Sequence, residues 1–599
     1  MFKTKSDRLN YGQLLTPPEG YVFEKAIGTT YSLDLETLTA IAITFGLSEE
    51  TDSELMKNPI SMLNALQKVS DKVLLFCEAG QIKLPSTTTP LCLLLEKMVV
   101  QVALGYDKKL KRYPAFHPKT WVIGFKGSNG ERVYRFIVLS RNLTFDRSWD
   151  ISVAIDGKVA GNANAQPVID FLAFLRKNLT NDSDYVKNHR KLLSGMMREL
   201  ENVEFTTNDK AFTDFQILPM GIGANAYEMS EDNLMKDTFH EVLVMSPFLS
   251  GSIIKEWNAL EKGLTNCKRT LITRRTELEK ISNKQASNFD VFVLKDTVID
   301  GEEALSDESL DKQKQDIHAK LYLRRKYSDI DLYLGSMNAS YAAVNKNVEM
   351  MVRLRTKNKY LNTDIFLNEL FDGNIDSPGN PFQKVEPEEN SNEKSKDESD
   401  KLERVIKDIC RMNGKAYVKE HEEKYDIEIK FDINKKMENV YISPLRSNKT
   451  CQIVDCVKFE QMDLLQLSEF YKIKVVGEEL SLERVIMIPT KGIPEEREKE
   501  VVHNIVKDKK SFIDYVVFVL GEDYVLSMME GKYLEENGFH KGGGYSMPAV
   551  YEKMLKTALE SPEKLNEINY LMKTLDDVDI VPEEFRKTYE TFRKTLKLK

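Results

Sequence analysis

The chain has few of the residues that build disulfide frameworks and metal clusters. Its 599 residues include 6 cysteines and 7 histidines, and no Cys-x-x-Cys pair occurs. Scattered cysteines in so long a chain are typical of reduced, mostly buried thiols in a cytoplasmic protein. Cys451 and Cys456 have neither zinc-site spacing nor a nearby histidine. We therefore expect a cytoplasmic protein without disulfides, bound metal or cofactor.

Long apolar runs are also missing. No stretch approaches the about 18 uncharged apolar residues that a transmembrane helix needs. The first residues, 1–7, contain no apolar core of a secretory signal. The most apolar segment, residues 91–104, contains Glu96 and Lys97, and we predict a buried amphipathic helix over residues 89–104.

An excess of positive charge is the third absence. Lysine and arginine number 85 against 94 aspartates and glutamates, which gives a formal net charge of -9. This balance argues against a strongly basic, non-specific nucleic-acid binder, although a local basic groove is compatible with it. Short basic clusters at 108–112, 274–275 and 324–326 fit solvated faces and binding patches equally well.

One segment has no aliphatic or aromatic side chain at all. Residues 386–401 consist of Glu, Asp, Lys, Ser and Asn with Pro387, so they cannot bury apolar surface. We predict a disordered linker at 381–401 that separates two lobes, residues 1–210 and 211–380, from a C-terminal accessory domain, residues 402–599. Proteolysis in the linker is then expected to leave an active N-terminal fragment.

What the sequence does contain is a short pattern that occurs twice. Each copy reads His-x-Lys, then an apolar stretch, then Ser-x-Asn. The copies consist of His117, Lys119, Ser140 and Asn142, and of His318, Lys320, Ser336 and Asn338. The segments around both copies alternate between strand and helix patterns, as expected for an α/β protein with mixed sheets flanked by helices.

The spacing places useful chemistry at one end of each sheet. Side chains at i and i+2 of a strand share a face, so His117 and Lys119 are expected to point the same way. An imidazole can attack phosphorus or donate a proton, while lysine and asparagine can hold the equatorial oxygens of a phosphodiester. Two half-sites would supply one nucleophile and one acid.

These motifs resemble those of the phospholipase D superfamily, which carries a duplicated His-x-Lys motif with a downstream Gly-Ser-x-Asn. Three further features agree, namely Ser246-Pro247-Phe248, Asn347-Val348-Glu349, and Asp150 as the first-half counterpart of Glu349. The family's Asp, seven residues after each His, is replaced by Gly124 and Arg325. In this respect the chain is similar to the tyrosyl-DNA phosphodiesterase and nuclease-like branch.

The resemblance implies two pseudo-symmetric phospholipase D-like lobes and catalysis by His117, Lys119, Asn142, His318, Lys320 and Asn338, supported by Ser140, Ser336, Glu349 and Asp150. The order of the family's motifs makes His117 the nucleophile and His318 the general acid. A metal-independent nuclease is the leading expectation. A phospholipid hydrolase and a non-catalytic scaffold for nucleic acid or a partner protein stay open.

Residues 402–599 are predicted to form an α+β or α/β domain. The pattern of strand 484–488, helix 495–507 and strand 515–520 is typical of a β-α-β unit. We find no catalytic constellation there, and the Gly-rich segment 540–545 lacks the context of a phosphate loop. The fusion of such a region to a nuclease-like core resembles bacterial restriction and phage-defence proteins, so the region is expected to position substrate or bind a protein partner.

Overall fold

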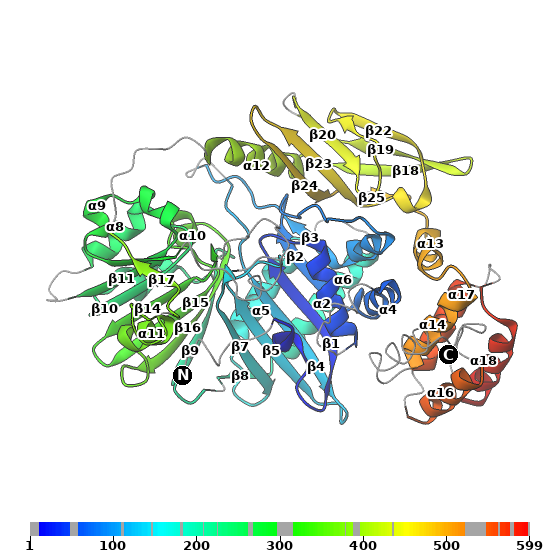
Figure 1. Ribbon diagram of the computed structural model, residues 1–599, viewed down its shortest axis with the longest axis horizontal. Coiled ribbons are helices and arrows are strands. Elements are labelled where there is room, and N and C mark those ends of the chain that lie inside the picture. The colour runs from blue at the N-terminus through cyan, green and yellow to red at the C-terminus, as the bar shows by residue number, and fades with distance from the viewer. Residues whose placement is uncertain are drawn as a thin grey trace.

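The structure, a computed structural model, describes residues 11–47, 58–108, 113–144, 148–179, 184–207, 209–223, 226–260, 267–295, 316–377, 379–386, 396–433, 437–520, 547–560, 564–575 and 580–596. Two large mixed sheets lie side by side, and a smaller β region and a group of helices are added to them (Figure 1). The predicted α/β class, with two sheet-based lobes followed by a C-terminal region of mixed structure, is confirmed.

Lobe 1 is built on a seven-stranded sheet in the order β3-β2-β1-β4-β5-β7-β8. Its strands are β1 (Tyr21–Thr30), β2 (Val73–Glu78), β3 (Val99–Val102), β4 (Thr120–Gly127), β5 (Arg132–Leu139), β7 (Ser152–Val159) and β8 (Val203–Thr206). Strands β1, β2 and β3 run parallel, and the pairs from β1–β4 to β7–β8 are antiparallel. Parallel strands need crossover connections. These are supplied by α2 (Leu35–Leu47), α4 (Pro59–Val69) and the 3₁₀ helix η1 (Pro90–Met98).

Successive side chains of the lobe 1 strands enter two different cores. Trp121 and Ile123 of β4 pack with α2 and α4, whereas Val122 packs with α5 (Gln166–Lys177) and α6 (Asp184–Leu200). This alternation is a consequence of strand geometry, because neighbouring side chains of a strand point to opposite faces of the sheet. The sheet is therefore covered by helices on both faces.

Lobe 2 repeats this plan in an eight-stranded sheet, β17-β12-β11-β10-β14-β15-β16-β9. Its strands are β9 (Asp214–Met220), β10 (Glu241–Met245), β11 (Lys268–Thr273), β12 (Asp290–Leu294), β14 (Leu321–Lys326), β15 (Asp329–Gly335), β16 (Glu349–Lys357) and β17 (Phe382–Lys384). The run β12-β11-β10-β14-β15-β16 has the same parallel and antiparallel pairings as β3-β2-β1-β4-β5-β7. Its helices include α8 (Gly251–Ala259), α10 (Tyr341–Asn345) and α11 (Thr363–Leu370).

The two lobes share one hydrophobic core. Phe116 and Phe136 of lobe 1 belong to the same buried cluster as Leu321 and Leu332 of lobe 2. Short β6 (Ser148–Trp149) of lobe 1 also pairs in parallel with β13 (Asp316–Ile317) of lobe 2. The expected lobe boundary at 210/211 falls between β8 and β9, which belong to different sheets.

The C-terminal region begins with α12 (Lys396–Cys410), which packs against β23 and β24. Two four-stranded sheets follow, β22-β19-β18-β25 and β21-β20-β23-β24. Their strands are β18 (Lys415–His421), β19 (Lys424–Lys430), β20 (Val440–Pro444), β21 (Cys451–Gln452), β22 (Cys456–Met462), β23 (Phe470–Val476), β24 (Ser481–Met487) and β25 (Thr490–Lys491).

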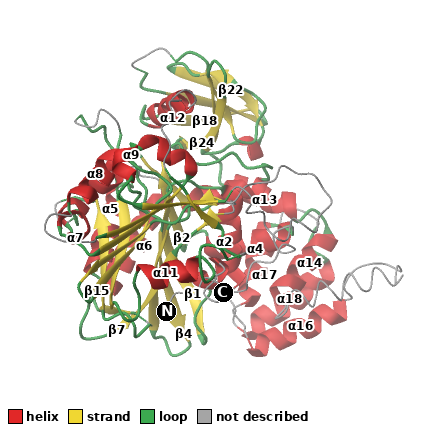
Figure 2. Cartoon of the chain, turned by 60° about the vertical axis from the view of Figure 1, so that its left-hand side comes forward, coloured by secondary structure: helices red, strands yellow, loops and turns green. Residues whose placement is uncertain are grey.

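A group of helices completes the chain (Figure 2). They are α13 (Glu496–Ile505), α14 (Lys509–Leu520), α16 (Met547–Glu560), α17 (Lys564–Thr574) and α18 (Glu583–Leu596). Among the described helices, none combines the length and the apolar content that a bilayer crossing requires.

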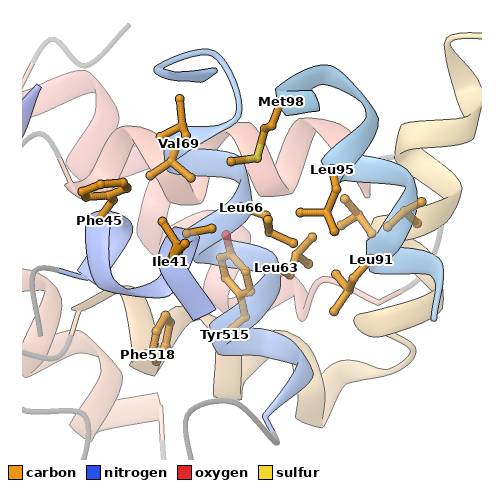
Figure 3. Packing of buried hydrophobic residues seen from close by; sticks show 14 of the residues in the cluster. Ile41, Phe45, Leu63, Leu66, Val69, Leu91, Leu95, Met98, Tyr515 and Phe518 are labelled. Atoms are coloured by element: carbon orange, nitrogen blue, oxygen red, sulfur yellow. The ribbon is translucent and has the colours of Figure 1, made fainter. Parts of the chain in front are cut away.

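These helices do not form a separate core. Tyr515 and Phe518 of α14 lie in one buried cluster with Ile41 of α2 and Leu66 of α4 (Figure 3). The hydroxyl of Tyr515 accepts a hydrogen bond from Asn64 Nδ2 at 3.1 Å. Lobe 1 and the last helices share buried side chains. Separating them would therefore expose apolar surface to water.

Two predicted elements are wrong. The segment expected to be helical over 89–104 is η1 followed by β3, because the residues from Val99 to Val102 pair with β2 and β-branched side chains suit that pleated surface. The segment 515–520, expected as a strand, belongs to α14, where it is buried among helices. A short apolar run fits a buried strand and a buried helix equally well, so periodicity does not separate them.

The predicted linker is also shorter than expected. Phe382–Lys384 forms β17 at the edge of the lobe 2 sheet, with Phe382 fully buried, and α12 begins at Lys396. The charged helix α12 contains Leu402, Ile406 and Ile409 at helical spacing, and these anchor it in a core. Residues 387–395, like the Gly-rich segment at 540–545, lie outside the described residues.

Candidate active site

Both copies of the repeated motif lie at the same end of corresponding strand pairs. Each His-x-Lys segment immediately precedes a strand, β4 or β14. Each Ser-x-Asn run directly follows the antiparallel partner strand, β5 or β15. The backbone N–H of Leu139 donates to Lys119 O at 2.9 Å, and that of Gly335 donates to Lys320 O at 3.3 Å. The register of each strand pair therefore brings the lysine of one segment beside the serine of the other.

The backbone just before β4 and β14 forms hydrogen bonds with the opposite lobe. The N–H of His117 donates to Val348 O at 2.9 Å, and the N–H of His318 donates to Trp149 O at 3.0 Å. Val348 directly precedes Glu349, and Trp149 directly precedes Asp150. Each histidine is thus fixed next to the carboxylate-bearing segment of the opposite lobe.

Glu349 reaches His117 across this interface. Its Oε2 lies 2.9 Å from His117 Nδ1, and the carboxyl group is completely buried. Ser336 Oγ donates to the same oxygen, and Asn347 Nδ2 donates to Oε1 at 3.3 Å. His117 therefore receives its carboxylate partner from the other half of the chain.

Burial lowers the pKa of His117 to about 4, although the charge of Glu349 acts in the opposite direction and that of Lys119 in the same direction. The imidazole is consequently neutral at neutral pH. A neutral ring beside a carboxylate donates its Nδ1–H, which leaves the lone pair on Nε2. The side chain is 14% exposed, so a substrate atom can approach this nitrogen.

Asp150 occupies the position in lobe 1 that Glu349 occupies in lobe 2. Ser140 Oγ donates to Asp150 Oδ1 at 3.4 Å and accepts the N–H of Ile151 at 2.8 Å. In lobe 2, Ser336 Oγ likewise donates to Glu349 and accepts the N–H of Met350 at 3.0 Å. The two supporting serines therefore hold the two carboxyl groups in the same way.

The two motif lysines are buried side by side. Lys119 is 1% and Lys320 is 3% exposed, and each ammonium donates to the carbonyl of its own histidine, at 2.9 Å and 2.5 Å respectively. Lys320 Nζ also lies 3.3 Å from Ser140 O of the opposite lobe. Burial and the charge of Lys320 hold the pKa of Lys119 well below its ordinary value, against the opposing charges of Glu349 and Asp150. Two close ammonium groups favour binding of an anion.

The asparagines differ in their surroundings. Asn338 is 8% exposed, and among the described residues its Oδ1 has no hydrogen-bond partner. Asn142 is half-buried, and its Oδ1 accepts the N–H of Ser32 at 3.5 Å. A buried amide oxygen without a partner is unfavourable unless a ligand donates a hydrogen bond to it. Asn338 is therefore well suited to contact a bound group.

Sequence reasoning named the segment that begins at Ser246 but missed its counterpart in lobe 1. Ser246 Oγ, directly after β10, accepts the N–H of Ala339 at 2.9 Å, and Thr30 Oγ1, at the end of β1, accepts the N–H of Leu143 at 3.0 Å. The next residue after Thr30, Tyr31, places its ring edge-on against His117 with 5.1 Å between centroids. Only the alignment of β1 with β10 in the duplicated fold could have indicated Tyr31.

Within the described residues, no three His, Cys, Asp or Glu side chains are grouped as a metal site would require. The functional groups where the two lobes meet are instead two imidazoles, two ammonium groups, two amides and two carboxylates. Such a set can bind a phosphate group, attack it and protonate a leaving oxygen.

No family model and no curated protein matches the sequence. Partial structural similarity exists to polyphosphate kinase from Porphyromonas gingivalis, with 14% identity and a TM-score of 0.31 over 66% of this chain and 50% of the kinase. This chain thus matches about half the length of that enzyme. Phosphatidylserine synthase from Haemophilus influenzae Rd KW20 is 11% identical, with a TM-score of 0.35 over 67% of this chain and 89% of the synthase.

A third solved structure with partial similarity is a phospholipase D family member, Nuc from Salmonella typhimurium. It is 15% identical, with a TM-score of 0.19 over 29% of this chain and 97% of Nuc. These similarities do not distinguish among branches, so the expected likeness to the tyrosyl-DNA phosphodiesterase branch stays a prediction. The chemistry of the site follows from its own geometry.

Proposed function

We propose that this chain is a metal-independent phosphodiesterase that cleaves nucleic acid through a covalent phosphohistidine. The observation that carries the proposal is the meeting of two His/Lys/Asn sets across the lobe interface. Glu349 of lobe 2 lies 2.9 Å from His117 of lobe 1, and Lys320 of lobe 2 lies 3.3 Å from the carbonyl of Ser140 of lobe 1. One phosphate group placed there contacts both sets.

In the proposed reaction, His117 is the nucleophile and His318 the general acid. His117 Nε2 attacks phosphorus, the P–O bond to the leaving oxygen breaks, and His318 transfers a proton to that oxygen. A water molecule then gives a proton to His318 and attacks phosphorus, which breaks the P–N bond and restores His117. Lys119, Lys320 and Asn338 stabilise the charge on the non-bridging oxygens. The neutral state of His117 suits the nucleophilic role.

An exposed aromatic ring, linked through Arg274 to the residue before His318, favours nucleic acid as the substrate. Phe248 is 42% exposed, and the guanidinium of Arg274 lies 4.7 Å from its ring centroid. Lys280 Nζ lies 5.8 Å from the same centroid, and Arg274 Nη2 donates to the carbonyl of Ile317 at 3.2 Å. Ile317 directly precedes His318. A ring with cations around it can stack a base while they attract the flanking phosphates.

Other readings have less support. A phospholipid hydrolase uses the same phosphodiester chemistry, but neither a base-stacking ring nor its flanking cations are needed for a headgroup. A scaffold without activity does not require both histidines to be held by backbone bonds from the opposite lobe. A protein partner for the C-terminal region and a role in restriction or phage defence stay predictions.

Replacing Phe248 by alanine is expected to lower kcat/KM on an oligonucleotide by about 5- to 160-fold, because stacking one base contributes about 1–3 kcal/mol. Hydrolysis of bis(p-nitrophenyl) phosphate should change less than about twofold, since this small diester does not extend to a flanking base. Steady-state kinetics on both substrates provide the measurement.

Tyr360→Ala is the matched control. Tyr360 is 38% exposed and has Lys359 Nζ 4.6 Å from its ring centroid, but it follows the end of β16 remote from Glu349. It should leave both activities unchanged. Equal losses on both substrates in Phe248→Ala would contradict the stacking role.

The proposed function is tested by incubating the full chain with labelled DNA, RNA and phospholipid vesicles, each with excess EDTA. Cleavage of a nucleic acid should persist, because the imidazoles and ammonium groups supply the acid, base and charge that bound Mg²⁺ would otherwise supply. Loss of activity in EDTA with recovery on adding Mg²⁺ would overturn the metal-independent mechanism. Preferential cleavage of phospholipid would overturn the choice of substrate.

A further inference from the structure

The first helix of the C-terminal region, α12, docks on lobe 1 beside the candidate active site. Gly80, which follows β2 with a φ of +76°, accommodates Ile406 of α12 so closely that a Cβ there would lie 2.8 Å from Ile406 Cγ2. Arg411, just after α12, donates from Nε to Leu104 O at 3.1 Å and lies over the ring of Tyr113 at 3.7 Å. The helix is therefore held on lobe 1 by a hydrogen bond to a backbone carbonyl and by a contact with an aromatic ring.

Lys407 extends from this docked helix to a buried carboxylate. Its Nζ lies 3.2 Å from Oε1 of Glu78, a residue that is completely buried at the end of β2. The other oxygen of Glu78 accepts the N–H of Phe116 at 2.8 Å. Phe116 is the residue before His117. One chain of contacts thus runs from α12 to the backbone that carries the histidine.

A second chain of contacts runs through Tyr31. Lys407 Nζ lies 3.5 Å from the Tyr31 hydroxyl and 5.4 Å from the centre of its ring. The same ring lies 5.1 Å from the His117 ring and 5.8 Å from Lys119 Nζ. The Tyr31 ring therefore forms a wall beside His117 and Lys119. Lys407 of α12 contacts that wall.

We propose that Lys407 is a positioning residue for His117, so that the C-terminal region completes the phosphodiesterase site of lobe 1. It acts through Glu78 on the backbone before His117 and through Tyr31 on the imidazole itself. The proposal rests on the phosphodiesterase function proposed above.

The contacts predict what loss of Lys407 would do. Glu78 would be left buried without its cation, and the Tyr31 wall would lose one of its supports. More water would then reach His117, whose other charged neighbours, Glu349, Lys119 and Lys320, stay in place. Because burial is the main cause of its low pKa, hydration should raise the pKa of His117 from about 4 toward its ordinary value of 6.5.

The test uses full-length Lys407→Gln, with Arg404→Gln as the matched control. Arg404 is an exposed cation on the same helix. Carbethoxylation of His117 by diethyl pyrocarbonate, followed at the peptide level by mass spectrometry from pH 4 to 8, reports the exposure and protonation of the ring without any turnover. In Lys407→Gln the reaction at pH 7 should be about fivefold faster, and its midpoint about one pH unit higher, than in wild type.

Kinetics on bis(p-nitrophenyl) phosphate give the second readout. A displaced nucleophile should lower kcat by about 10- to 100-fold while KM changes less than about twofold, because the defect lies in geometry rather than in anion binding. Arg404→Gln should match wild type in both experiments. Identical His117 reactivity and identical kcat in Lys407→Gln and wild type would overturn the proposal.

Two further results separate the causes of failure. If thermal denaturation shows that Lys407→Gln does not fold, Tyr31→Leu decides, because it removes the wall and leaves the Lys407–Glu78 pair. A faster His117 reaction in Tyr31→Leu supports the proposal, and an unchanged one overturns it. If wild type hydrolyses no phosphodiester, the proposed function fails, but the reactivity of His117 still measures its dependence on Lys407.

Discussion

Replacing His117 by alanine is expected to lower kcat by about 10⁴-fold or more, because the covalent route then has no nucleophile. His318→Ala should behave differently on bis(p-nitrophenyl) phosphate. The nitrophenolate leaves without a proton, so the first step proceeds, while hydrolysis of the adduct is slowed by the missing base. A phosphohistidine that is stable to alkali and labile to acid should therefore accumulate in His318→Ala, and mass spectrometry should place it on His117.

His421→Ala is the control for general effects of removing an imidazole, because His421 is exposed at the end of β18. It should retain wild-type kcat and accumulate no adduct. An adduct on His318 in the His117→Ala variant would reverse the assigned order of the two histidines. The absence of an adduct in both variants, with activity abolished in both, would contradict the two-step scheme.

Removing the C-terminal region by ending the chain at residue 386 is expected to abolish activity even on a small diester. The sequence alone predicts the opposite, since both motifs lie before that point. In the structure, however, α2, α4 and η1 bury Ile41, Leu63 and Leu95 against side chains of the last helices. Each large apolar side chain exposed by truncation costs about 1.5–3 kcal/mol, and a few of them equal the about 5–15 kcal/mol that stabilises a domain. Circular dichroism and turnover on bis(p-nitrophenyl) phosphate measure the result.

Polar contacts across the same interface add to this expectation. Arg497 Nη1 lies 2.9 Å from Glu96 Oε2, and the N–H of Val485 donates to Ile82 O at 2.9 Å. The matched control is the full chain with a protease site placed among residues 387–395. Cutting there should leave the two pieces associated and active, because their shared core remains intact. A truncated chain that is folded and fully active would show that the shared core is dispensable.

The sequence by itself determined the residues of the candidate site and the class of the fold. The duplicated His-x-Lys and Ser-x-Asn runs are local signals, and the register of the neighbouring strands brings Lys119 beside Ser140 and Lys320 beside Ser336. The alternation of apolar strands and helices likewise indicated a mixed sheet in each half. Such patterns are legible because backbone geometry fixes the period with which side chains return to one face.

Only the tertiary structure decided how these pieces are joined. His117 and Glu349 are separated by 232 positions, and nothing local to either shows that the carboxylate crosses from the opposite lobe. Lys407 belongs to no motif of the sequence, yet its helix docks beside Glu78 and Tyr31. The segment 515–520 is helical, and the last helices share the buried core of lobe 1. In each case the outcome depends on which distant apolar face covers the segment, and this is a property of the whole packed chain.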